Sequence, residues 1–96
     1  MDISHNPGTE RFAVHLAGGE AYVSYRQRGE LMDIVSTWVP PEHRRLGIGE
    51  KLVICALNHA QANEYKVIPT CPFVPDVINA HPEYETLIVD LSLIHI

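Results

Sequence analysis

The chain has 96 residues, of which 46% are hydrophobic and 20% charged, and these proportions indicate one small globular domain. Its formal net charge of −5 argues against a nucleic-acid-binding domain, which normally presents a basic face. Two cysteines are too few for a disulfide framework, and no apolar run approaches the length of a membrane span. The first eight residues are polar and unlike a signal peptide, so we expect a reduced cytoplasmic setting and no membrane partner.

The first half of the chain predicts a loose segment and three strands. Residues 1–9 contain an Asn-Pro-Gly turn sequence and no periodicity, so we expect a flexible tail there. Residues 11–16 and 21–26 alternate apolar and polar side chains, and Gly18-Gly19 between them predicts a hairpin. Residues 31–39 are largely apolar on both sides, which predicts a central strand covered on both faces.

The second half predicts a strand–helix–strand unit and a second short helix. Residues 48–63 have the periodicity of an amphipathic helix, and residues 65–70 predict a fourth strand. A crossover of this kind makes the fourth strand a parallel neighbour of the third. Residues 75–80 can form the second helix. The apolar tail at residues 86–96 should add a strand or pack on another subunit, which gives a monomer or a weak homodimer through this tail.

The turn before the predicted helix carries the main functional signal. It follows the pattern Arg44-x-x-Gly47-x-Gly49. The first turn of a helix has unpaired backbone N–H groups and a partial positive charge, and glycines let a ligand approach the main chain, so a phosphate or pyrophosphate would fit. A Walker A loop is excluded because Glu50 follows Gly49, and Leu52 occupies the third glycine position of a dinucleotide fingerprint. An ordinary strand-to-helix turn with solvated arginines is the alternative.

The chain resembles the very small, single-domain branch of the GNAT superfamily of acetyl-CoA-dependent N-acetyltransferases. The resemblance covers about residues 10–88 and rests on an ordered set of segments: 11–12, 21–25, 37–41, 44–49, 67–74 and 81–84. It implies an α/β fold with a compact mixed sheet, in which an antiparallel meander precedes a parallel strand pair joined by a helix. The N-terminal helices of larger relatives are missing. The expected divisions are a tail at 1–9, the acetyltransferase domain at 10–88 and an apolar C-terminal extension at 89–96.

The resemblance implies acetyl-CoA as cofactor and an amine acceptor, either a small molecule or a protein lysine. In similar folds the third strand splays from the fourth, so the pantetheine arm can bind along exposed backbone, and a main-chain N–H can polarise the thioester carbonyl. The expected CoA-binding residues lie on the third strand, the turn, the start of the helix and the end of the fourth strand. They are Thr37, Trp38, Val39, Arg44, Arg45, Leu46, Gly47, Ile48, Gly49, Glu50 and Cys71.

Cys71, His81 and Tyr84 are the candidate catalytic residues. Cys71 ends the fourth strand at the edge that faces the expected gap. It could be an acyl-accepting nucleophile, a wall of the acetyl pocket, or a small residue that fits before a proline. His81 suits a general base near neutral pH but could also be an exposed turn residue, and the Tyr84 hydroxyl could protonate a departing thiolate. The other histidines have no ligand-like spacing, so we expect no metal.

Three positions depart from the family pattern. Ser36 stands where a histidine is common, Arg45 replaces a glycine of the loop, and Val77 replaces an aromatic residue. Ser36 argues against a strand histidine as general base, and it keeps open a non-catalytic acyl-CoA-binding module. A structural or interaction protein that assembles through the apolar tail is the remaining alternative.

Overall fold

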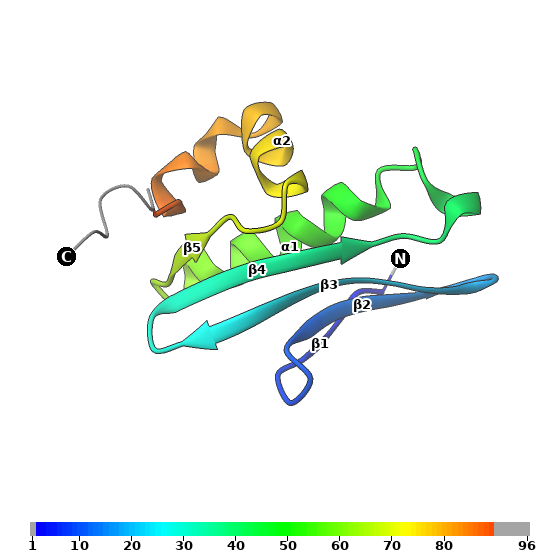
Figure 1. Cartoon of the computed structure of the whole chain (residues 1–96), viewed down its shortest axis with the longest axis horizontal. Coiled ribbons are helices and arrows are strands. Elements are labelled where there is room, and N and C mark those ends of the chain that lie inside the picture. Colours follow the sequence, from blue (N-terminus) through cyan, green and yellow to red (C-terminus); the bar gives the residue numbers. More distant parts are fainter. Residues whose placement is uncertain (1, 90–96) are drawn as a thin grey trace.

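The computed structural model describes residues 2–89 and contains one five-stranded mixed sheet in the order β1-β2-β3-β4-β5. Neighbouring strands from β1 to β4 are antiparallel, and β4 and β5 are parallel. This arrangement confirms the α/β fold class with a meander followed by a parallel pair (Figure 1). The strands are β1 (Ser4–Asn6), β2 (Arg11–Leu16), β3 (Gly19–Arg28), β4 (Leu31–Trp38) and β5 (Lys66–Ile68).

The helices follow β4 and β5 in the chain. A 3-10 turn, η1 (Pro41–His43), leads from β4 to α1 (Ile48–Ala62), and α2 (Phe73–Ala80) with a second 3-10 segment, η2 (Pro82–Leu87), follows β5. Figure 1 shows α1 lying along the sheet, with α2 on the side of β5 and α1. None of the helices within residues 2–89 is both long and apolar enough to cross a membrane.

The core lies between α1 and the side of the sheet that faces it. Alternation along the strands supplies one side, since Val23, Met32 and Ile34 are fully buried. The helix supplies the other through its apolar stripe, in which Leu52 and Leu57 are fully buried. Truncating such a leucine to alanine typically costs about 2–5 kcal/mol, so this stripe holds α1 against the sheet.

The N-terminal residues require a correction, because Ser4–Asn6 forms an edge strand and not part of a loose tail. The His5 ring stacks on Phe12 at 4.1 Å, and His5 Nε2 lies 2.6 Å from the hydroxyl of Tyr25. These contacts join residues distant in the sequence. A three-residue strand has too little periodicity to be predicted locally.

The predicted burial of the third strand on both faces is wrong. Met32 and Ile34 are fully buried towards α1, whereas Leu31 is 36% and Trp38 43% exposed. The reason is that α2 packs mainly against α1 and η2, so it leaves much of the other face of β4 uncovered.

Prolines explain two further differences in element bounds. β5 ends at Ile68 and not at residue 70, because Pro69 has no N–H to donate to a ladder. Helix α2 begins at Phe73, two residues earlier than expected, because Pro75 lies in the first helical turn, where N–H groups have no intrahelical partner.

The beginning of the apolar tail continues the sheet beside β5. Val67 and Ile88 form a parallel bridge, and the Val89 amide donates a hydrogen bond to the Val67 carbonyl over 2.9 Å. Within residues 2–89 this bridge is isolated and no strand forms in the tail, so the predicted added strand stays a prediction. The rest of the predicted tail, residues 90–96, lies outside the described residues, so tail-mediated assembly stays a prediction.

Candidate functional site

The candidate site lies where β4 and β5 separate. Their parallel pairing covers only three positions and ends with Asp33 opposite Ile68, although β4 continues to Trp38. The Cys71 amide then donates to the Ile34 carbonyl over 2.8 Å, which closes the ladder at the mouth of the gap. Beyond this bond, the edge of β4 facing β5 has no strand partner among the described residues.

A β-bulge lies at the same level of β4. Ser24 pairs with Ser36 and Tyr25 with Ile34, so Val35 is an extra residue on β4. A bulge bends its strand and increases the local twist. The end of β4 therefore changes direction at the level where β5 ends, and this opens the gap between the two strands.

The turn after β4 is held by contacts with strand residues and with the β2–β3 hairpin. Arg44 donates from Nε to the carbonyl of Val39 over 3.0 Å, and its guanidinium lies 5.0 Å from the centre of the Trp38 ring. His43 donates from Nε2 to the carbonyl of Ala17 over 2.6 Å. These bonds fix the path of the turn beside the gap.

Gly47 positions the start of α1. It caps the helix in the left-handed conformation, with φ 76° and ψ 11°, and no side chain caps this end. The first backbone N–H groups of α1 are therefore available to a ligand. Gly49 matters for packing. A β-carbon at this position would lie 3.1 Å from Phe73 Cε2, so the lack of a side chain lets Phe73 pack closely against the helix.

These parts enclose a cavity of about 590 Å³. This volume lies within the range of small-molecule and cofactor sites. The cavity walls come from the end of β4, the turn, the first turn of α1 and the start of α2: Thr37, Trp38, Val39, His43, Arg44, Arg45, Gly47, Ile48, Gly49, Glu50 and Phe73.

The predicted CoA-binding residues all line this cavity except Leu46 and Cys71. Leu46 is 63% exposed. Two lining residues, His43 and Phe73, were not predicted as site residues. Phe73 lies inside the segment 67–74 that carries the family resemblance, and His43 lies between the segments 37–41 and 44–49. The signal that could have found them was that His43 directly precedes Arg44 and that Phe73 follows Cys71 by two residues.

Cys71 lies beside the cavity without lining it. It is buried, with 5% of its surface exposed, and its Sγ is 3.5 Å from Thr37 Oγ1, a residue that does line the cavity. The second cysteine, Cys55, lies on α1, and burial raises the pKa of its thiol. The structure thus brings one of the two thiols near the gap.

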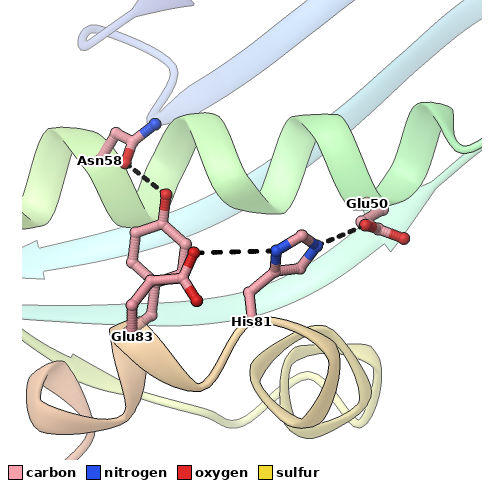
Figure 2. Close-up of polar contacts among 5 residues, drawn as sticks. Glu50, Asn58, His81 and Glu83 are labelled. Carbon is pink, nitrogen blue, oxygen red and sulfur yellow. Dashed lines mark hydrogen bonds and ion pairs between the residues drawn. The ribbon is translucent and has the colours of Figure 1, made fainter.

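His81 reaches the cavity through Glu50. Figure 2 shows His81 between two carboxylates, with Nε2 2.6 Å from Glu50 Oε1 and Nδ1 3.9 Å from Glu83 Oε2. Glu50 comes from the first turn of α1 and lines the cavity, so its carboxylate connects the histidine to the site. This pair can hold or relay a proton at the cavity wall.

Tyr84 points to another part of α1. Its hydroxyl donates a hydrogen bond to Asn58 Oδ1 over 2.7 Å, and Tyr84 does not line the cavity. Asn58 lies two helical turns beyond Glu50. In this arrangement the phenol anchors η2 to α1.

Residues 2–89 contain no cluster of three His, Cys, Asp or Glu side chains suited to binding a metal ion.

Comparison with known proteins identifies the family and agrees with the fold. Residues 11–87 match the sequence model of the family described as GCN5-related N-acetyl-transferase. The fold is similar to the NMR solution structure of a GCN5-like protein from Staphylococcus aureus, proposed to be an N-acetyltransferase. The TM-score is 0.71 at 23% sequence identity, over 92% of this chain and 87% of the other. Because the family match extends over most of the sequence, the chain belongs to the GCN5-related N-acetyltransferase family.

Proposed function

We propose that this protein binds acetyl-CoA in the gap between β4 and β5 and transfers the acetyl group to an amine. The observation that carries this function is the cavity of about 590 Å³ in which the uncapped start of α1 meets the open end of β4. A phosphate-binding helix end and an open strand edge in one cavity match the two chemically different halves of CoA.

The pyrophosphate would bind at the start of α1. Gly47 adds no side chain that could block the main chain, and Arg44 and Arg45 add positive charge to the same wall. Glu50 brings a negative charge into this wall, but its Oε1 is held by His81 at 2.6 Å. This hydrogen bond turns that carboxylate oxygen towards His81 and away from the place proposed for the pyrophosphate.

The pantetheine arm would lie along the open edge of β4. Thr37, Trp38 and Val39 line the cavity from this strand, so an extended ligand can exchange hydrogen bonds with their backbone in the manner of an added strand. This path leads from the phosphate turn towards Thr37 and the neighbouring Cys71 sulfur. A main-chain N–H along it would polarise the thioester carbonyl.

Acetyl transfer would then be direct. The amine nitrogen attacks the carbonyl carbon, the C–S bond breaks, and the CoA sulfur leaves as a thiolate that gains a proton to become the thiol. The amine loses one proton to a water molecule, and the thiolate takes its proton from the same solvent, so the protons balance. Cys71 serves in this scheme as a wall of the site and forms no acyl intermediate.

Thermal-shift titration with acetyl-CoA, CoA, ATP and NAD tests the binding step. A ligand at a hundredfold excess over its dissociation constant stabilises a protein by about 2.7 kcal/mol, which raises the melting temperature by about 10–20 °C in a domain of this size. We expect this shift with both CoA species only. Equal shifts with ATP, or none with millimolar acetyl-CoA, would reject CoA binding.

Release of the CoA thiol, measured with a chromogenic disulfide, tests the transfer step. We expect thiol release from acetyl-CoA to depend on an added amine, for which lysine-containing peptides and small primary amines serve as two panels. Binding of CoA without amine-dependent release in either panel would identify a non-catalytic acyl-CoA-binding module.

A further inference from the structure

A second cavity, of about 390 Å³, lies at the other end of the molecule. Its walls come from the N-terminal strand and the turn after it, from β3, and from the last part of α1. The side chains that matter chemically are those of His5, Glu10, Tyr25, Gln27, His59 and Tyr65.

This cavity is separate from the CoA site. Gln27 pairs with Met32 near the start of β4, whereas the CoA cavity begins at Thr37, five residues further along the strand. Five residues of strand span about 16 Å. The fully buried side chains of Ile34 and Leu52 belong to the core that fills the space between α1 and the sheet. A ligand in the second cavity therefore does not meet the acetyl group.

Four aromatic rings line the second cavity, from β1, β3, α1 and the segment after α1, and Phe12 of β2 packs behind one of them. His5 stacks on Phe12 with ring centres 4.1 Å apart, and the His59 ring meets His5 edge-on at 4.6 Å. Tyr65 lies 6.0 Å from His59, and the Tyr25 hydroxyl is 2.6 Å from His5 Nε2. Burial and the neighbouring His59 lower the pKa of His5, so this ring is neutral at pH 7.

Glu10 supplies a negative charge to the same cavity. One carboxylate oxygen, Oε2, accepts a hydrogen bond from the Gln27 amide over 2.7 Å, and Glu10 makes no ion pair with any described residue. The backbone fixes its position, since its own amide donates to Pro7 and its carbonyl accepts from Tyr25. Its carboxylate is near enough to Tyr25 to contribute to the raised pKa of that phenol.

The side chain of Gln27 adds an unpaired acceptor. Its Nε2 donates to the Gly29 carbonyl over 2.8 Å, which settles the orientation of the amide group. Its Oε1 is buried and has no donor. A buried acceptor without a partner is costly, so this oxygen favours a ligand that brings N–H or O–H groups.

We propose that the second cavity is a binding site for a small organic cation with a primary ammonium group. Its N–H groups would donate to Glu10 and Gln27, and its charge and carbon chain would lie against the rings of Tyr25, His59 and Tyr65. No lysine or arginine is among the described residues that line this cavity, so an anion would find no opposite charge. This site is independent of acetyl-CoA binding.

NMR titration of the full chain with 1,4-diaminobutane tests this site, with sodium chloride at equal ionic strength and sodium butyrate as controls. Saturable shifts are expected at the Gln27 side-chain amide and at the His5, Tyr25 and His59 rings, and they should persist with saturating CoA. Equal shifts with butyrate or with salt alone, or no saturation, would overturn the site.

A matched pair of variants tests the role of the charge. Glu10→Gln keeps an oxygen that can accept the Gln27 amide hydrogen bond and removes only the charge, whereas Glu85→Gln removes a charge from η2, outside the cavity. We expect diaminobutane to bind Glu10→Gln about tenfold more weakly than wild type and Glu85→Gln normally. Unchanged affinity in Glu10→Gln would overturn the assignment. If Glu10→Gln fails to fold, the titrations of the wild-type protein with diaminobutane and with butyrate still test whether the cavity binds a cation.

Discussion

Substitution of Gly47 separates backbone strain from crowding at the turn before α1. Gly47 has φ 76°, and a β-carbon built on it would meet nothing within 4 Å. Alanine therefore has room here but is strained, because the left-handed conformation costs an L-residue about 1–2 kcal/mol. We expect Gly47→Ala to lower the free energy of unfolding by about that amount, which in a domain of this size lowers the melting temperature by about 4–16 °C.

Two further variants serve as controls for Gly47→Ala in urea denaturation followed by circular dichroism. Gly47→Asn should lose less stability, because asparagine tolerates the left-handed conformation better. Gly49→Ala should respond to packing, since its β-carbon would lie 3.1 Å from Phe73 Cε2. Wild-type stability in Gly47→Ala, or an equal loss in Gly47→Asn, would refute backbone strain as the cause.

Three other predictions concern charge, thiols and pH. Arg44→Ala and Arg45→Ala should each weaken CoA binding measured by calorimetry, whereas a substitution elsewhere that leaves the cavity intact should not. Wild-type affinity in both arginine variants would exclude the pyrophosphate from this turn. CoA should slow labelling of Cys71, 3.5 Å from Thr37 Oγ1, and leave that of Cys55 unchanged; equal protection would place the arm elsewhere. His5 has a pKa below its ordinary 6.5 in the folded state, so its stabilising contribution is present above pH 6.5 and is lost as the pH falls through the folded pKa. Urea denaturation at neutral and acidic pH should therefore show a larger loss for wild type than for His5→Phe, and equal losses would contradict this sign.

Local sequence patterns predicted the elements whose burial repeats along the chain. β2 has the expected bounds, because its alternation of apolar and polar residues matches the strand period. α1 forms where helical periodicity predicted it and buries one apolar stripe that includes Leu52, Val53 and Ala56, because these residues recur on one helical face. The turn between β4 and α1 was also predictable as a strand-to-helix connection, since its arginines and glycines all lie within residues 44–49.

Features that depend on distant pairing were not predictable in this way. The bulge at Val35 has no glycine to mark it and appears only in the register of β3 against β4. The contact between Glu50 and His81 joins residues 31 positions apart, and neither neighbourhood indicates the other. β1 likewise depends on the stacking of His5 on Phe12, and the exposure of Trp38 depends on where α2 packs.

The gap between β4 and β5 follows from three local causes that act at one level of the sheet. Pro69 cannot donate to a ladder, the bulge at Val35 turns β4, and the bond from Cys71 to Ile34 fixes the chain leaving β5 at the mouth of the gap. An open strand edge would ordinarily invite pairing with another chain. Here it is short and partly satisfied, because Arg44 donates to the carbonyl of Val39 at its far end. An extended ligand could therefore add hydrogen bonds to β4 without breaking any pair between the strands, and this low structural cost is the physical argument for the proposal that the gap takes a long, flexible cofactor.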